Sequence, residues 1–129
     1  MDPCLLSDWI AISGSSSVTS ITQPASQWKD LADHEDAVFF LEVKELSGTV
    51  TMFYESSPTC QDQLFVPVIP AFTMAAGKKV DPALFSTGGF PLCRYLRWRL
   101  TGSNAGGAPW SSTFRIWVAL YSYGVEDGL

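Results

Sequence analysis

The sequence contains little charge and few of the residues that catalysis or metal binding requires. Only 16% of its 129 residues are charged, against roughly 25% in ordinary soluble domains. His34 is the only histidine, and the three cysteines, Cys4, Cys60 and Cys93, form no CxxC pair. A structural zinc site needs clustered Cys or His ligands, so the sequence argues against one. The odd number and wide spacing of the three cysteines predict reduced thiols or small core residues rather than a set of disulfides.

Long apolar runs and an excess of basic charge are also missing. No run approaches the roughly 18 apolar residues that a membrane helix needs. The first segment, "MDPCLLSDWIAIS", has an early acid and no basic region, so no signal peptide is expected. The formal net charge of −5 argues against binding to a nucleic-acid backbone. We therefore expect a protein made in a cytoplasm, without membrane, nucleic acid or cofactor among its partners.

Hydrophobic residues, in contrast, make up 47% of the chain and alternate with polar residues. The alternation is clearest in four segments: "DAVFFLEVKEL", "GTVTMFYES", "RYLRWRLTG" and "STFRIWVALYS". A period of two is typical of antiparallel strands with one buried face. Weaker strands are expected at residues 8–13, 17–22, 64–69 and 71–75. No segment predicts an amphipathic helix, and "ASQWKDLADHED" predicts a single helical turn at most.

The fold prediction is an all-β antiparallel β-sandwich or jelly roll of about eight strands. The length suits a single domain over residues 1–129, in which residues 1–22 form either an N-terminal arm or an edge strand. Turn residues separate the strands, for example in "AAGKK". The glycine-rich "GSNAGGAPWSS" predicts a hairpin loop between the two strands on either side of it.

Three arginines in "RYLRWRLTG" are many for an acidic chain. Alternation places Leu96, Trp98 and Leu100 on one face and Tyr95, Arg97 and Arg99 on the other. If the last two strands pair as a hairpin, one outer face collects arginines and aromatics: Tyr95, Arg97, Arg99, Arg115, Trp117 and Tyr121. Such residues are enriched at protein interfaces. The face is interpreted either as a solvated sheet surface, as a subunit contact, or as a site for carbohydrate or single-stranded nucleic acid.

Residues for other kinds of site are sparse. Trp28, and Trp110 in the loop "GGAPW", are candidates for stacking on a glycan, although a loop tryptophan often folds back over the core. Asp30, Asp33 and Asp36 are the candidates for a calcium site, but an acidic cluster is usually a solvated loop. The sequence predicts no metal site there.

Catalytic machinery has equally little support in the sequence. His34 lies beside Glu35 with no GxSxG motif for a nucleophile, and no glycine-rich phosphate-binding loop precedes a helix. A carboxylate pair for glycoside hydrolysis would have to be built from Glu42, Glu45 and Glu55, but Glu42 and Glu55 lie on predicted strands where an outward-facing acid is ordinary. We therefore expect no enzyme.

The C-terminal half resembles small β-sandwich structural proteins of tailed bacteriophages. The resemblance covers residues 39–120. It rests on the order of four segments: "GTVTMFYESS", "LFVPVIPAFTMAAGKKV", "RYLRWRLTGSNAGG" and "STFRIWVAL". The long acidic segment before Phe39 and the proline-rich "PVIPAF" depart from the pattern of these proteins.

The resemblance implies a virion component, namely a capsid decoration protein or another minor head or tail protein. Its partners would be sister subunits, often in a trimer, and the major capsid protein or another virion protein. It implies no catalytic residue. The alternative from another functional class is a lectin-like glycan-binding β-sandwich.

Overall fold

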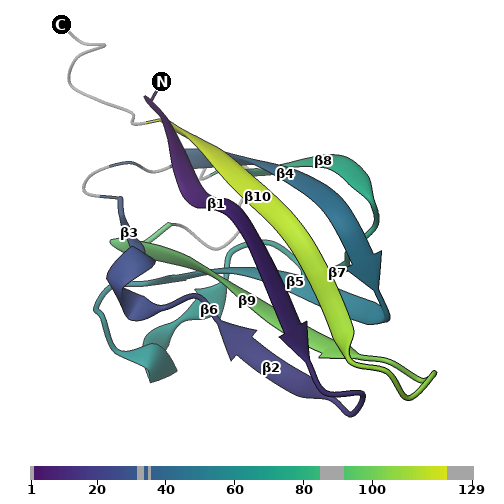
Figure 1. Ribbon diagram of the computed structural model, residues 1–129. Coiled ribbons are helices and arrows are strands. Elements are labelled where there is room, and N and C mark those ends of the chain that lie inside the picture. The colour runs from purple at the N-terminus through teal and green to yellow at the C-terminus, as the bar shows by residue number, and fades with distance from the viewer. Residues whose placement is uncertain (1, 32–33, 35, 85–91, 122–129) are drawn as a thin grey trace, which may run out of the picture.

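The computed structural model describes residues 2–31, 34, 36–84 and 92–121, which form two antiparallel sheets packed face to face (Figure 1). Sheet A contains, in spatial order, β1 (Asp2–Gly14), β10 (Trp110–Tyr121), β4 (Asp36–Ser47) and β8 (Gly77–Ala83). Sheet B contains β2 (Thr19–Thr22), β9 (Tyr95–Ser103), β5 (Thr49–Ser57) and β6 (Val66–Pro67), while β3 (Lys29–Asp30) also pairs with β9 and β7 (Phe72–Thr73) with β5. Two short 3₁₀ turns, η1 (Ala25–Gln27) and η2 (Asp62–Leu64), lie beside sheet B.

The topology is that of a jelly roll. The chain crosses from one sheet to the other at β1–β2, β3–β4, β4–β5, β7–β8, β8–β9 and β9–β10. If β2 and β3 are counted as one interrupted strand along β9, and β6 and β7 as one along β5, each sheet has four strand positions. Eight strands in two sheets with interleaved connections define the jelly roll. The predicted all-β sandwich is therefore confirmed.

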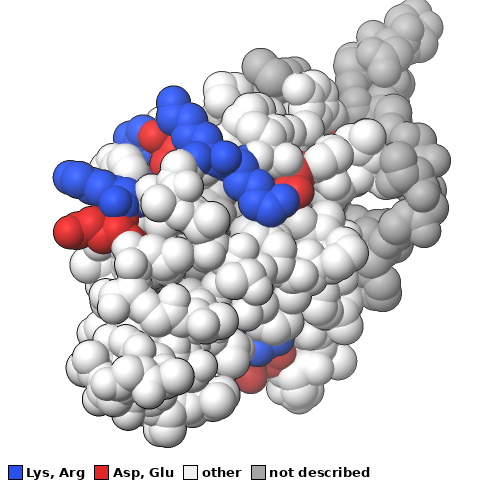
Figure 2. Space-filling model, turned by 90° about the vertical axis from the view of Figure 1, so that its right-hand side faces the viewer, with Lys and Arg blue, Asp and Glu red and all other residues white. Residues whose placement is uncertain are grey.

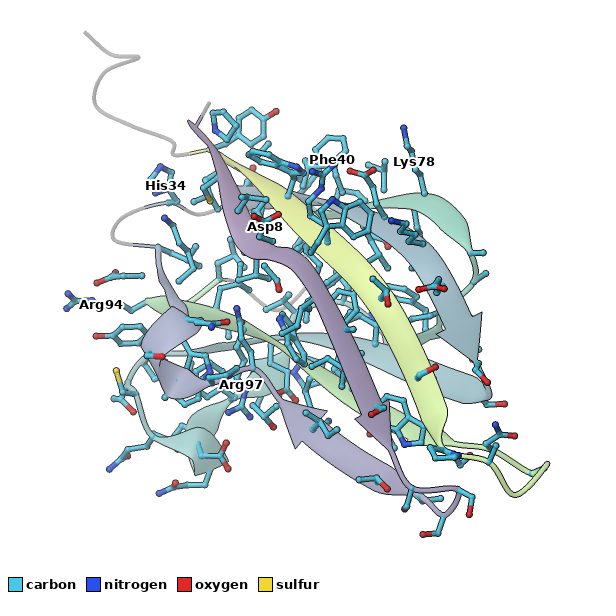
Figure 3. The ribbon with its side chains drawn as sticks, viewed as in Figure 1. Asp8, His34, Phe40, Lys78, Arg94 and Arg97 are labelled. Carbon is cyan, nitrogen blue, oxygen red and sulfur yellow. The ribbon has the colours of Figure 1, made fainter. Side chains whose placement is uncertain are left out.

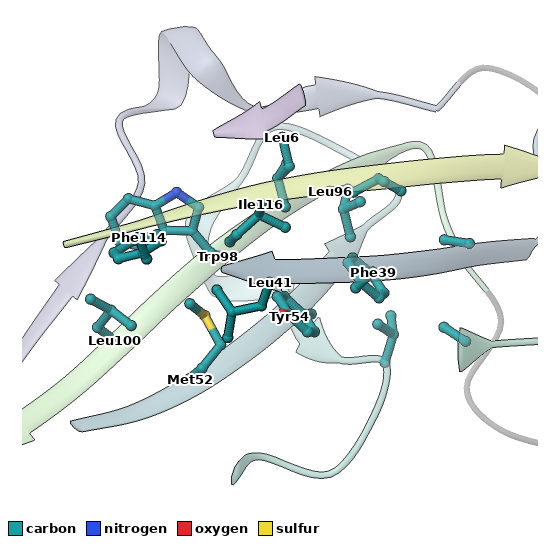
Figure 4. Packing of buried hydrophobic residues seen from close by; sticks show 14 of the residues in the cluster. Leu6, Phe39, Leu41, Met52, Tyr54, Leu96, Trp98, Leu100, Phe114 and Ile116 are labelled. Carbon is teal, nitrogen blue, oxygen red and sulfur yellow. The ribbon is translucent and has the colours of Figure 1, made fainter. Parts of the chain in front are cut away.

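The core lies between the sheets, and the alternating residues fill it as the sequence predicts. Leu96, Trp98 and Leu100 of β9 are completely buried, and the inward residues of β4, β5 and β10 are buried with them (Figure 4). Aromatic pairs join the two layers. Phe39 of β4 stacks on Tyr54 of β5 with ring centres 4.0 Å apart. Such contacts tie sheet A to sheet B directly.

Trp110 closes one end of the sandwich. It begins β10, and its indole is fully buried. The ring lies between the backbones of Gly14 in β1 and Gly102 in β9, so close that a Cβ at either glycine would collide with ring atoms. The two glycines are therefore required by the close approach of the ring.

Two expectations about the loops are wrong. The glycine-rich segment does not close a hairpin, because β9 belongs to sheet B and β10 to sheet A. The segment beginning "GKK" is not a turn but strand β8, which pairs with β4 at the edge of sheet A. The segment 1–22, for which both an arm and an edge strand are expected as alternatives, contains two edge strands. Residues 2–14 form β1 at the opposite edge of sheet A, with two register shifts against β10, and residues 19–22 form β2 at an edge of sheet B.

Candidate assembly surfaces

The outer face of sheet B holds Arg97 in a closed network. Arg97 lies opposite Glu55 of β5, and its side chain is only 5% exposed. Its guanidinium donates to the Glu55 carboxylate at 3.0 Å and to Asp62 of η2. It also lies 4.0 Å from the ring centre of Phe65 and 5.2 Å from that of Trp28. Its charge therefore compensates acids of the same chain and is covered from solvent.

The two other arginines of "RYLRWRLTG" are also paired within the chain. The Nε of Arg99 donates to the other Glu55 oxygen at 3.0 Å, and its guanidinium lies 3.8 Å from the ring centre of Phe53. Arg94, just before β9, pairs with Asp30 at 3.1 Å, and this hydrogen bond raises the pKa of the Arg94 guanidinium. The arginines of this segment hold strands and turns together.

The outer face of sheet A is different, because apolar side chains cross it from edge to edge. The register aligns one exposed residue from each strand: Leu5 of β1, Trp117 of β10, Phe40 of β4 and Val80 of β8. We call these four residues the apolar row. They are 37% to 55% exposed. A second set of small apolar residues, Pro3, Ala119, Val38 and Pro82, follows beside them in register.

Charged residues border the apolar row on its other side. In strand order from β1 to β8 they are Asp8, Arg115, Glu42 and Lys78, which we call the charged row. Asp8 shares its position with Trp9, because the register shift places both residues opposite Arg115. Arg115 donates to Glu42 at 2.7 Å and lies 4.8 Å from the Trp9 ring centre. The charges along this row alternate in sign.

Figure 3 labels members of both rows. In Figure 3, Asp8, Phe40 and Lys78 are spread across sheet A, whereas Arg97 lies beside sheet B. In Figure 2, charged atoms gather in the upper part of the view as touching blue and red groups, above a large white area. A hollow of about 260 Å³ lies over β4 and β8 and is lined by residues of both rows, among them Phe40, Trp117 and Lys78.

The six predicted interface residues do not form one patch. Tyr95, Arg97 and Arg99 lie on sheet B, and Arg115, Trp117 and Tyr121 lie on sheet A. The single patch depended on the hairpin between β9 and β10, which is absent from the described residues. Of the first group, Arg97 is buried. Trp117 and Tyr121 are exposed, and Trp117 belongs to the apolar row.

The two tryptophans considered for glycan stacking are occupied by the fold. Trp110 is fully buried between the sheets, so its ring offers no face to a sugar. Trp28 is half-buried: its ring contacts Phe65 at 4.6 Å, and its Nε1 donates to the Gln23 carbonyl at 2.8 Å. The alternative of a glycan-binding module therefore loses Trp110 as a contact.

The polar residues weighed for chemistry are dispersed. The His34 Nδ1 donates to the Leu31 carbonyl at 2.7 Å. Glu42 and Glu55 lie on the outer faces of opposite sheets, so they cannot act as a carboxylate pair. Asp30 pairs with Arg94, Asp36 is buried, and Asp33 lies outside the described residues. In the described part of the chain, no three acidic, cysteine or histidine residues gather as metal ligands, and the three cysteines form no disulfide.

Sequence reasoning missed most of the apolar row. Phe40 lies in a predicted strand, but its outward position looks like an ordinary exception in "VFFLEV". Val80 lies in a segment interpreted as a turn, and Leu5 precedes the predicted start of the first strand. The signal becomes visible only when the pairing partners of all four strands are known, because alternation gives the face of a residue but not its neighbours.

Comparisons of the sequence with models of protein families and with curated proteins find no match. The fold resembles a chain from Bacillus endospore appendages, described as forming a novel family of disulfide-linked pili: 15% identity, TM-score 0.45, covering 96% of this chain and 93% of that one. It also resembles a chain in the structure of infectious bursal disease virus, Gx strain: 13% identity, TM-score 0.52, covering 96% of this chain but only 32% of that one. At such identities the likeness is one of fold. Among the described residues, no helix has the length and apolar character needed to cross a membrane.

Proposed function

We propose that the protein is a non-enzymatic structural subunit of a virion, namely a capsid decoration protein or another minor head or tail protein of a tailed bacteriophage. The observation that carries this proposal is the apolar row across the outer face of sheet A. Contiguous exposed apolar surface bordered by charge is typical of protein interaction sites. Jelly rolls are common in viral capsid domains, and the sequence resembles phage structural proteins.

The proposed mechanism is surface complementarity. The apolar row is removed from water when a sister subunit or another virion protein covers sheet A, and the charged row then orients the contact. The network around Arg97 acts within the chain, where it joins β9 to β5 and η2. Attachment through many copies raises the strength of a weak single contact.

The test is quantitative mass spectrometry of purified particles of the virus that carries the gene. The proposal predicts the protein in particles, in a fixed and repeated ratio to the major capsid protein. The protein would be released together with other attached proteins when the particles are mildly denatured. Detection in infected cells but not in purified particles would contradict the proposal.

A further inference from the structure

We propose that two copies of this chain pair face to face through sheet A, about a two-fold axis parallel to the strands. The inference rests on the proposed function. It adds the identity of the partner, a second copy of the chain, and the face through which the two copies meet. It is carried by the order of side chains in the two rows.

The axis reverses the order of the strands. When two sheets pack face to face about such an axis, β1 of one copy lies over β8 of the other, and β10 lies over β4. Packed sheets lie about 10 Å apart with their strands within about 30° of parallel. Each residue of the apolar row then meets an apolar residue of the second copy: Leu5 meets Val80, and Trp117 meets Phe40.

The charged row decides the occupant and the direction of the axis. Read from β1 to β8, its charges are negative, positive, negative and positive, at Asp8, Arg115, Glu42 and Lys78. Reversal places Asp8 against Lys78 and Arg115 against Glu42, so every charge meets its opposite. A two-fold axis perpendicular to the strands and passing through this row would place each charge over its own copy, and like charges at an interface are strongly unfavourable. The row is thus complementary to itself in one arrangement.

The relief of the face fits the same arrangement. The hollow of about 260 Å³ lies over β4 and β8, between Phe40, Val80 and Lys78. The opposite half of the face carries Leu5 and Trp9 on β1, whose side chains are exposed and border a second hollow of about 350 Å³. Because the axis places β1 over β8, these side chains reach the hollow over β4 and β8 of the second copy. A contact of this kind is isologous and closes after two subunits.

The experiment is a reciprocal charge exchange followed by sedimentation velocity, over protein concentrations up to the millimolar range. Lys78→Glu alone and Asp8→Lys alone each create two like-charge contacts per pair. Each should raise the dissociation constant of the pair by about tenfold or more. The double variant Asp8→Lys/Lys78→Glu restores opposite charges and should recover the wild-type constant. The control is Arg94→Glu, which replaces a positive with a negative charge as Lys78→Glu does, but beside sheet B. It should leave the dissociation constant unchanged.

The outcomes separate this inference from the proposed function. The pairing is supported if each single variant raises the dissociation constant of the pair and the double variant recovers the wild-type constant, provided that all variants melt at the wild-type temperature. A double variant as weak as the singles overturns the arrangement. A wild-type trimer, as the phage resemblance implies, would join unlike faces; it overturns the two-fold pairing and leaves self-assembly in place. A monomer at every concentration overturns the pairing. If sugars then change the tryptophan fluorescence of the wild type but not of Trp117→Phe, the face is a glycan platform instead, and particle mass spectrometry still decides the virion role independently.

Discussion

At the scale of single residues, the surplus of arginine in "RYLRWRLTG" is explained by burial. Arg97 is enclosed by Glu55, Asp62 and the rings of Phe65 and Trp28, whereas Arg94 lies in solvent beside Asp30. A buried charge that loses its partner is costly, but an exposed ion pair contributes little. Two arginines three positions apart therefore have different energetic roles.

Arg97→Ala should lower the free energy of unfolding by about 3 kcal/mol, because it leaves Glu55 buried with Arg99 as its remaining partner. Arg94→Ala serves as the matched control and should leave the stability nearly unchanged. Urea unfolding monitored by circular dichroism measures both. Equal losses in the two variants would show that the network around Arg97 is not the stabilising element.

Tyr54 is a second residue whose environment can be tested. Its hydroxyl is buried without a hydrogen-bond partner among the described residues, and burial, with the charge of Asp81, raises its pKa well above the ordinary value. In the unfolded chain a tyrosine ionises near pH 10. Above about that pH the unfolded state releases a proton that folded Tyr54 keeps, so stability falls as the pH rises.

Tyr54→Phe should therefore keep the ring stacked on Phe39 and raise stability at neutral pH by up to about 1 kcal/mol. It should also reduce the loss of stability above about pH 10. Thermal melting of both proteins at neutral and alkaline pH makes the comparison. A variant that melts earlier than wild type at neutral pH would indicate that the hydroxyl has a stabilising partner.

At the scale of secondary-structure elements, alternation in the sequence predicted faces well and partners poorly. The inward sets of β4, β5, β9 and β10 are those that the period of two indicates, because burying alternate side chains is a local requirement. Pairing is not local. Successive strands usually neighbour each other, yet β9 and β10 lie in different sheets, so the predicted interface was divided between them.

Strand β8 was missed for a related reason. Its sequence, "GKKVDPA", contains glycine, aspartate and proline, which are typical of turns, together with two lysines. At a sheet edge the same residues have another use, because lysine and proline discourage pairing with a further strand. Composition alone does not separate the two cases, so the apolar row that ends at Val80 could not be assembled from sequence.

The end of the sandwich near Trp110 offers a test at this scale. Gly102→Ala should lower the free energy of unfolding by about 1–3 kcal/mol, because the new methyl group meets the indole. In a Trp110→Ala background the same change should cost much less, since the collision is gone. A double-mutant cycle from denaturant unfolding gives the coupling. Additive effects would contradict the account of this contact.

At the scale of the whole molecule, the two outer faces have different characters. Sheet B carries arginines that are satisfied within the chain, and sheet A presents apolar residues in register beside charges of alternating sign. Exposure of these apolar side chains to water raises the free energy of the single chain, and association removes that exposure. We therefore expect the protein to assemble through sheet A.

The most direct test of this central claim is the molar mass of the wild type and of Trp117→Ala, measured by light scattering after size exclusion at matched concentrations. Pairing through sheet A predicts a wild-type mass approaching twice the 14.1 kDa of one chain. It predicts the mass of a single chain for the variant. Because Trp117 lies outside the core, the variant should melt at the wild-type temperature when both are measured at concentrations low enough to be single chains. Equal masses for the two proteins, whether one chain or several, would contradict assembly through sheet A.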